Sequence, residues 1–218
     1  MPVLLGVEML MIDRNLQPKA VEALEMIRRN VMLESQFIDE LLDMTRISRG
    51  KFDLSRQPMD LHQAARLAAE VVMPDINKKG QRLIIALDAT AHELSGDFKL
   101  LQQVFWNLLK NASKFTPEGG EITIRSRNES VASDNPDRIV IEVSDSGIGF
   151  DAEVAERIFE PFIQANQLIT QRFGGLGLGL AIAKATIDAH GGTIRGISLG
   201  SGKGATFTVS LPLSEPMS

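Results

Sequence analysis

Apolar side chains recur at helical spacings through residues 18–49, which contain no glycine and no internal proline. Pro18 suits the first turn of a helix and Gly50 suits its end. The pattern therefore predicts one long helix, about 45 Å long at a rise of 1.5 Å per residue. Its apolar seam consists of Leu24, Ile27, Val31, Ile38 and Leu41.

Residues Val3–Ile12 are mainly apolar and predict part of a partner helix, joined to the long helix by the turn DRNLQ. Two helices cannot bury such a seam by themselves, so a dimeric four-helix bundle is the expected completion. The alternative is a hairpin that packs on the rest of the same chain. We assign residues 1–50 to this helical hairpin.

From Lys51 the pattern changes to strands that alternate with amphipathic helices, which predicts an α/β domain over residues 51–218. Strands are predicted near Phe52–Ser55, Leu83–Leu87, Glu121–Arg127, Arg138–Val143, Thr193–Ser198 and Ala205–Leu211. Helices are predicted near Leu61–Val72, Lys99–Lys114, Ala152–Ile158 and Leu180–His190. Residues Phe159–Gly175 have weak periodicity and are too long for an ordinary connection, so we expect a functional lid there.

Composition narrows the class of protein. Hydrophobic residues make up 44% of the 218 positions, enough for an aliphatic core, and the net charge of −5 argues against a nucleic-acid partner. The absence of cysteine excludes disulfides and thiolate metal sites. No apolar run reaches the roughly 18 residues of a membrane span. We therefore expect no direct membrane insertion, and a cytoplasmic protein or the cytoplasmic part of a larger sensor protein.

Polar residues line one face of the helix predicted at Lys99–Lys114. The stripe consists of Gln103, Asn107, Lys110, Asn111 and Lys114. Asparagine is a poor helix former in mid-helix, so Asn107 and Asn111, four positions apart, indicate a functional role. Amide oxygens suit Mg²⁺, and Lys114 could neutralise a phosphate. An ordinary solvated helix face is the alternative.

Two glycine-containing segments follow. A predicted strand runs into Asp145, whose carboxylate could accept an exocyclic N–H while Gly147 and Gly149 let a flat base approach; a tight acidic turn is the alternative. The stretch RFGGLGLGLAI has four glycines in six positions before a helix. Glycine costs about 1 kcal/mol in a helix, which a phosphate at the helix N-terminus would explain. Neither the Walker nor the Rossmann spacing fits, and a hinge is the alternative.

In chain order, NLLKNASKFT, DSGIGF, IFEPF, GGLGLGLAIAK and GKGATF resemble the N, G1, F, G2 and G3 boxes of sensor histidine kinases, within the GHKL ATPase superfamily. The resemblance implies a Bergerat-type α/β (α+β) sandwich of a mixed sheet and helices that binds ATP and Mg²⁺. Residues 51–218 would form this catalytic domain. Residues 1–50 would be part of the dimerisation and histidine-phosphotransfer domain. The implied partners are a second copy of the chain and a response-regulator receiver domain.

The resemblance also assigns roles to single residues. Asn111 would ligate Mg²⁺, with Asn107 beside the metal and the phosphates. Asp145 would bind the adenine amino group, with Gly147 and Gly149 shaping the wall beside it. These assignments place the base and the metal at two ends of one site.

Further residues of the family pattern would complete the catalytic site. Lys114 and Arg172 would contact phosphate, Arg172 at the γ-phosphate, and both would serve catalysis together with Asn107. Phe115 would flank the nucleotide, and Thr206 would reach the adenine through water. Phe159 and Phe162 would anchor the lid. The triphosphate would be wrapped by Gly175, Leu176, Gly177, Leu178, Gly179 and Leu180.

The family's phosphoacceptor histidine stands in a box of the form H-E-L-R-T-P, which this chain lacks. His62, His92 and His190 have different surroundings, and structural roles are predicted for all three. The chain is expected to begin just after that box, as a truncation or a natural variant, and not to phosphorylate itself. Leu100 stands where many relatives carry an arginine, which removes one auxiliary contact.

Asn107 takes the place of the glutamate with which hydrolytic relatives such as DNA gyrase activate water. We therefore expect slow hydrolysis, and transfer of the γ-phosphate to a histidine outside this chain and then to a response-regulator aspartate. The alternatives are a GHKL-type ATP hydrolase and a nucleotide-sensing regulatory module without autokinase activity.

Overall fold

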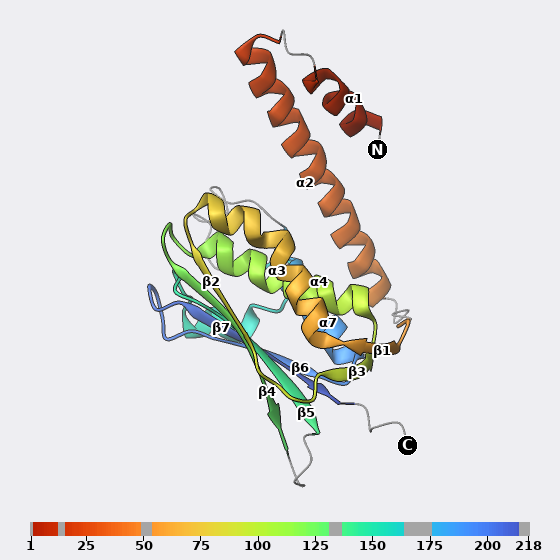
Figure 1. The fold of residues 1–218 in the computed structure, drawn as a ribbon, viewed down its shortest axis with the longest axis vertical. Coiled ribbons are helices and arrows are strands. Elements are labelled where there is room, and N and C mark those ends of the chain that lie inside the picture. Colours follow the sequence, from red (N-terminus) through yellow and green to blue (C-terminus); the bar gives the residue numbers. More distant parts are fainter. Residues whose placement is uncertain (1, 13–15, 49–53, 131–136, 164–175, 214–218) are drawn as a thin grey trace.

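The computed structural model describes residues 2–12, 16–48, 54–130, 137–163 and 176–213, which form a helical hairpin and an α/β globular part (Figure 1). The hairpin consists of α1 (Pro2–Met11) and α2 (Pro18–Ser48). The strands are β1 (Gln57–Asp60), β2 (Arg82–Leu87), β3 (Glu93–Gly96), β4 (Glu121–Glu129), β5 (Arg138–Asp145), β6 (Thr193–Ile197) and β7 (Ala205–Pro212). The helices of the globular part are α3 (Leu61–Lys78), α4 (Phe98–Phe115), α5 (Ala152–Arg157) and α7 (Gly179–Ala189).

A mixed five-stranded sheet in the order β2-β4-β5-β7-β6 forms one layer of the globular part. Strands β2 and β4 run parallel, and the other neighbours in this sheet are antiparallel. Strands β1 and β3 form a separate antiparallel pair at the start of α3 and α4. Helices α3, α4 and α7 make up the second layer (Figure 1). The predicted two-layer α/β architecture, preceded by a helical hairpin, is thereby confirmed.

The core forms where the apolar face of α4 meets the sheet. Phe105 and Leu108 are fully buried, as expected for apolar residues on one face of an amphipathic helix. On the sheet, Ile122 and Ile124 in β4 alternate with more exposed neighbours and point into this core, which Ile141 of β5 also joins. Each such side chain contributes about 1.5–3 kcal/mol by leaving water. This packing fixes α4 on the sheet.

Two predicted boundaries are wrong. Leu54 and Ser55 are not in a strand, and the strand lies at β1 instead; residues 52–53 of that prediction lie outside the described residues. Helix α3 does not end near Val72 but continues through Pro74 to Lys78. Pro74 has no backbone N–H, so the carbonyl oxygen of Glu70 has no helical donor. Both residues are exposed, so water can donate to that oxygen instead.

The hairpin leaves its apolar seam open. In α1 Val7 is buried, whereas Val3, Leu5 and Met9 stay more than half exposed. In α2 Ile38 is 58% exposed. Helix α2 contacts α1 and α7, and most of its length extends away from the globular part (Figure 1). Among the described side chains of the seam, packing on the same chain therefore leaves Ile27, Ile38 and Leu41 exposed and Leu24 and Val31 half-buried. No helix in the described parts of the chain has the length and apolar character needed to cross a bilayer.

A buried histidine joins the end of α7 to the start of α4. The Nδ1 atom of His190 lies 2.7 Å from the carbonyl oxygen of Thr186, and the backbone N–H of Asp97 donates to Nε2 at 3.0 Å. A carbonyl only accepts, so Nδ1 carries the proton and the ring is neutral. Burial lowers the pKa of His190 below its ordinary value of 6.5.

The neutral His190 predicts a loss of stability in mild acid. Because the pKa is lowered in the folded state, the stabilisation is complete above pH 6.5 and is lost as pH falls below that value towards the lowered pKa. The thermal unfolding midpoint should fall between about pH 7.5 and about pH 5.5. His190→Gln should cost about 1–3 kcal/mol at the higher pH and should show a shallower decline.

Part of the decline should persist in the variant, because burial and the neighbouring His92 also lower the pKa of His62. Equal slopes for the wild type and His190→Gln across this pH range would contradict the assigned tautomer.

Candidate functional site

Helix α4 carries Asn107 to the point where α4 meets α7. Asn107 is buried, at 7% exposure, and its Nδ2 donates to the carbonyl oxygen of Gly179 at 3.3 Å. A Cβ added to Gly179 would lie 3.4 Å from Cγ and Oδ1 of Asn107. The mid-helix asparagine and the glycine-rich helix start therefore touch, although 72 positions separate them. Asn111 lies one turn further along α4 and is half-buried.

The C-terminal end of α4 contacts the turn that follows β5. The N–H of Ile148 donates to the carbonyl oxygen of Phe115, the last residue of α4, at 3.2 Å. A Cβ on Gly147 would lie 2.6 Å from that same oxygen, so a side chain cannot be accommodated there. The two segments predicted to hold the metal and the base thus meet through their backbones.

The last glycine segment closes on the same turn. The N–H of Gly204 donates to the carbonyl oxygen of Gly147 at 3.0 Å, and the N–H of Gly202 donates to that of Ile148 at 2.6 Å. Gly204 has φ of 69°, and a Cβ there would collide with the carbonyl oxygen of Asp145. These contacts fix the backbone around Asp145 before any ligand arrives.

Asp145 is half-buried at the end of β5. Its Oδ1 accepts the N–H of Gly147 at 2.8 Å, and the carboxylate also accepts the N–H of Ala205. Burial raises the pKa of Asp145 above its ordinary value, while the two N–H groups act in the opposite direction. A further N–H donor from a ligand would stabilise the ionised carboxylate, which fits the predicted contact with an adenine amino group.

Thr206 is not brought to the side chain of Asp145. In the antiparallel register Asp145 lies opposite Ala205, and Thr206 lies opposite Ser144. Cross-strand partners share a face of the sheet, so Thr206 and Ser144 point away from Asp145. Their hydroxyl oxygens are 3.0 Å apart. Sequence alone does not show which of the two residues after Gly204 faces the helices.

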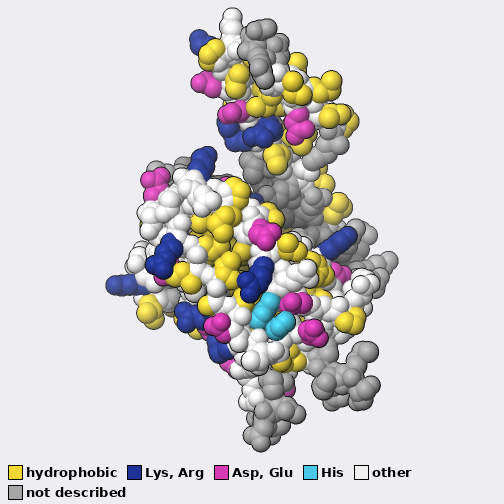
Figure 2. Space-filling view, in the orientation of Figure 1, with side chains coloured by type: hydrophobic (Ala, Val, Ile, Leu, Met, Phe, Trp, Pro, Cys, Tyr) yellow, Lys and Arg dark blue, Asp and Glu magenta, His cyan; other side chains and the backbone are white. Residues whose placement is uncertain are grey.

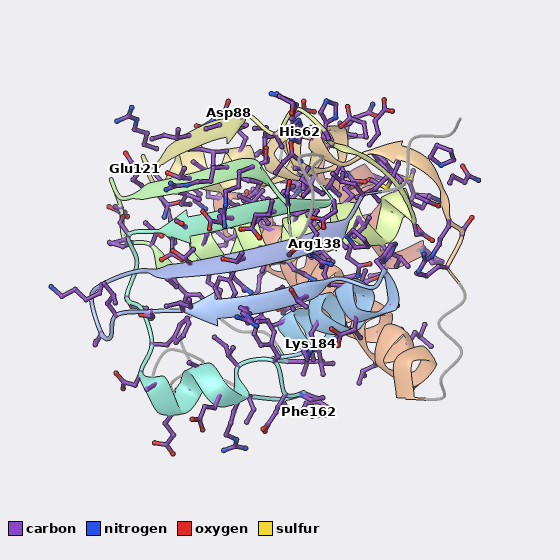
Figure 3. The ribbon with its side chains drawn as sticks, turned by 90° about the horizontal axis from the view of Figure 1, so that it is seen from below. His62, Asp88, Glu121, Arg138, Phe162 and Lys184 are labelled. Carbon is purple, nitrogen blue, oxygen red and sulfur yellow. The ribbon has the colours of Figure 1, made fainter. Side chains whose placement is uncertain are left out.

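The two phenylalanines predicted to anchor the lid have different surroundings. Phe159 packs edge-on against Phe207, with ring centroids 6.3 Å apart. Phe162 is 63% exposed and has φ of 65°, and its N–H donates to the carbonyl oxygen of Gly177 at 3.1 Å. In Figure 3 its side chain points away from the sheet. Arg172 and Gly175 lie outside the described residues.

The residues before and within the first turn of α7 are only partly accessible. Leu178 is fully buried, and Leu180 packs against the core. Leu176 and Gly177 are half-buried. Any ligand at this end of α7 would therefore meet backbone groups rather than the leucine side chain at position 178.

Lys79 and Gln81 hold the end of α4, a role that the sequence does not predict. The Nζ atom of Lys79 donates to the carbonyl oxygens of Ser113 (2.6 Å) and Lys114 (3.1 Å). The Nε2 atom of Gln81 donates to the carbonyl oxygen of Thr116 at 2.7 Å. Burial lowers the pKa of Lys79. Nothing in the run NKKGQ distinguishes these residues from solvated ones, because their partners lie more than 30 positions away.

Lys114 and Phe115 lie beside each other at this end of α4, with Lys114 Nζ 4.9 Å from the centre of the Phe115 ring. A cation over an aromatic face is stabilised by the ring quadrupole. Helix α4 thus carries four predicted site residues between its contact with α7 and its contact with the turn after Asp145: Asn107, Asn111, Lys114 and Phe115.

Comparisons with known proteins show the family of this chain. Residues 96–215 match the family described as "Histidine kinase-, DNA gyrase B-, and HSP90-like ATPase". The autoinducer 2 sensor kinase/phosphatase LuxQ of Vibrio parahaemolyticus is 30% identical over 97% of this chain and 25% of its own length. The circadian input-output histidine kinase CikA of Thermosynechococcus vestitus is 33% identical over 93% of this chain and 27% of its own length.

Among solved structures, full-length ShkA in complex with AMPPNP is similar, with a TM-score of 0.79 and 25% identity. That match covers 99% of this chain and 43% of ShkA. The chain spans about a quarter of the length of the two sensor kinases described above. Because the family match covers more than half of the residues, the chain belongs to the histidine kinase-, DNA gyrase B- and HSP90-like ATPase family, with an ATP-binding domain of the sensor histidine kinase type.

Proposed function

We propose that this chain is the kinase core of a two-component sensor histidine kinase. It transfers the γ-phosphate of ATP to a histidine outside this chain, from which the phosphate passes to an aspartate of a response regulator. The observation that carries the proposal is the buried amide of Asn107 against the first residue of α7. An amide cannot take a proton from water as a carboxylate does, so hydrolysis lacks its general base at this position.

Adenine binds at the turn after β5. The Asp145 carboxylate accepts the adenine amino group. Gly147 and Gly149 shape the wall beside it, because a Cβ at either position would collide with a backbone carbonyl oxygen, of Phe115 and of Gly200 respectively. The support is the fixed backbone of this turn, which Ile148 and Gly204 tie to neighbouring segments. A preorganised acceptor avoids the entropic cost of ordering a loop on binding.

The phosphates and Mg²⁺ lie between α4 and the start of α7. Asn107 and Asn111 offer hard amide oxygens of the kind that suit Mg²⁺, which takes its remaining ligands from water and phosphate. Lys114 contacts phosphate as a point charge, and Arg172 contacts the γ-phosphate. The backbone N–H groups around Gly179, at the N-terminus of α7, face the same anion. The magnesium ion would supply positive charge to offset that of the phosphates.

The residues of this chain hold ATP and orient its γ-phosphate for the reaction. The acceptor imidazole attacks the γ-phosphorus in line, the bond to the leaving ADP oxygen breaks, and Lys114 offsets charge on the oxygens. Lys79 and Gln81 keep the end of α4, and with it Lys114, in place through their bonds to its carbonyls.

None of the three histidines is a suitable acceptor. His62 and His190 are buried and hydrogen-bonded. His92 lies at the opposite end of α3 from Lys79, which marks the nucleotide end, and α3 spans 18 residues, about 27 Å. The acceptor histidine therefore lies outside the 218 residues of this sequence.

Homodimerisation through the hairpin is part of the proposal. The apolar side chains that α1 and α2 leave exposed, among them Met9, Ile38 and Leu41, are of the kind that a second hairpin buries in a four-helix bundle. The receiver domain of a response regulator is the second partner.

The contact at Asp145 predicts the behaviour of Asp145→Asn. The amide oxygen would stay with the N–H of Gly147, so the amide NH₂ would oppose the adenine amino group, and two donors would face each other. Mg-ATP affinity measured by calorimetry should fall about 10- to 100-fold. Magnesium tripolyphosphate, which lacks the base, should bind the wild type and the variant equally.

Asp188→Asn, which removes an exposed carboxylate from the outer side of α7, is the matched control and should bind ATP normally. Equal weakening of ATP and tripolyphosphate by Asp145→Asn would overturn the adenine contact.

The kinase reaction is tested by measuring ATP hydrolysis and phosphate transfer in the same assay. The chain is incubated with Mg-ATP labelled at the γ-phosphate, alone and with a dimerisation domain from a related sensor kinase that carries the H-E-L-R-T-P box. We expect little phosphate release, no acid-labile label on this chain, and label on the added domain. Asn107→Ala should lower transfer about 100-fold, whereas Ala at the exposed Asn77 should not.

Brisk phosphate release without label on the added domain would favour an ATP hydrolase. Tight ATP binding with neither release nor transfer would favour a regulatory module.

The open seam predicts concentration-dependent dimers. Light scattering should show a dimer for the wild type and a monomer for the double variant Ile38→Glu and Leu41→Glu. Both side chains are exposed in the single chain, so the variant should keep its fold and its Mg-ATP affinity. Glu22→Lys, another exposed change on α2, should not dissociate the dimer. A wild type that stays monomeric at every concentration would contradict this interface.

A further inference from the structure

A second cluster of metal-binding side chains lies at the start of α3. Asp60 precedes the helix, His62 lies in its first turn, and His92 comes from the segment between β2 and β3. One ligand atom from each residue lies within 4.8 Å of the others. Figure 2 shows histidine side chains reaching the surface of the globular part beside acidic ones.

Backbone contacts hold these three residues together. The N–H of Leu61 donates to the carbonyl oxygen of His92 at 3.0 Å, and β1 pairs with β3 directly beside the cluster. Asp60 caps α3, since its Oδ1 accepts the N–H groups of His62 (2.8 Å) and Gln63 (3.2 Å). The carboxylate is therefore fixed in place by the fold and not by a metal.

The ligand atoms of the cluster lie close together and partly bonded to one another. His92 Nδ1 lies 2.9 Å from Asp60 Oδ1, close to the ligand separation of about 3.3 Å in a tetrahedral zinc site. His62 Nε2 lies 2.9 Å from the hydroxyl oxygen of Ser126. In the tautomer in which Nε2–H donates to that hydroxyl, Nδ1 carries the lone pair, and such an outer bond is typical of metal-bound histidines.

Binding requires a small rearrangement. The rings of His62 and His92 are stacked, with centroids 4.3 Å apart and planes at 15°, so their in-plane lone pairs run nearly parallel. The largest separation of ligand atoms must close from at most 4.8 Å to about 3.3 Å. The His92 ring can make this movement because its side chain is 33% exposed, while hydrogen bonds between Ala91 and Asn128 hold the backbone before it.

We propose that Asp60, His62 and His92 bind one transition-metal ion of the borderline type, such as Zn²⁺ or Co²⁺, with water completing the coordination shell. The ion replaces the proton between His92 and Asp60 and clamps the segment before β3 to the start of α3. Imidazole with carboxylate is a donor set that prefers these ions to Mg²⁺.

The proposed site is independent of the nucleotide site. Helix α3 has 18 residues and is about 27 Å long, and the cluster lies at its N-terminal end. The residue that follows its other end, Lys79, bonds the carbonyls at the end of α4. Nucleotide and transition metal should therefore bind without competing.

The test is a titration of the untagged, metal-free chain with Co²⁺, followed by visible absorption, and with Zn²⁺, followed by calorimetry. We expect one equivalent to bind, with ligand-field bands of a low-coordinate Co²⁺ site and a raised unfolding midpoint. An excess of Mg²⁺ should not displace the ion. Mg-ATP affinity should be the same with and without Zn²⁺.

Two variants remove ligands without removing the fold. Asp60→Asn keeps the helix cap, because asparagine caps as well as aspartate, but loses the charged ligand. His92→Gln removes a partly exposed ring of similar size. Each should weaken Co²⁺ and Zn²⁺ binding by more than about 10-fold. His190→Gln, which changes the histidine outside the cluster, should bind both ions like the wild type.

Binding that persists unchanged in both Asp60→Asn and His92→Gln would show an adventitious ion only and would overturn the proposal. The absence of any saturable binding of Co²⁺ or Zn²⁺ to the wild type would overturn it as well.

Discussion

The close approach between the end of α4 and the turn after β5 determines the rest of the site. The carbonyl oxygen of Phe115 accepts the N–H of Ile148, and the same oxygen leaves no room for a side chain at Gly147. This contact joins a helix that carries amide and ammonium groups to a strand end that carries a half-buried carboxylate. The proposed nucleotide site, with Asn111 and Asp145 on one ligand, depends on this contact. Lys79 and Gln81 also hold this end of α4, through hydrogen bonds to the carbonyl oxygens of Ser113 and Thr116.

The parts of the fold that the sequence predicts are those with a strong period. The apolar face of α4, the alternation in β4 and the apolar run of β5 predict their elements, because each pattern is contained within one segment. Strands β1 and β3 have only four residues each, too few for a period to stand out in the sequence, so the prediction places one of them wrongly and omits the other. The role of Lys79 and the orientation of Thr206 depend on partners distant in sequence, which no local pattern reveals.

In the two proposals, the ends of α3 serve two different ligands. Lys79 and Gln81, which follow its C-terminal end, hold the end of α4, and α4 would bind Mg-ATP through its amide oxygens and the ammonium group of Lys114. The N-terminal end of α3 holds two imidazoles and a carboxylate, which suit a softer ion. Both ends are tied to neighbouring segments by backbone hydrogen bonds, to the Gly119–Gly120 turn at one end and to His92 at the other. The spacing between them is set by the length of a single rigid element.

The most direct measurement is a titration of the isotope-labelled chain with Mg-ATP, followed by amide NMR signals. The side-chain amides of Asn107 and Asn111 and the backbone amides of Gly147 and Ile148 should shift together, with one common dissociation constant. Shifts confined to one of these two segments, or two different dissociation constants, would show that α4 and the turn after β5 do not form one nucleotide site.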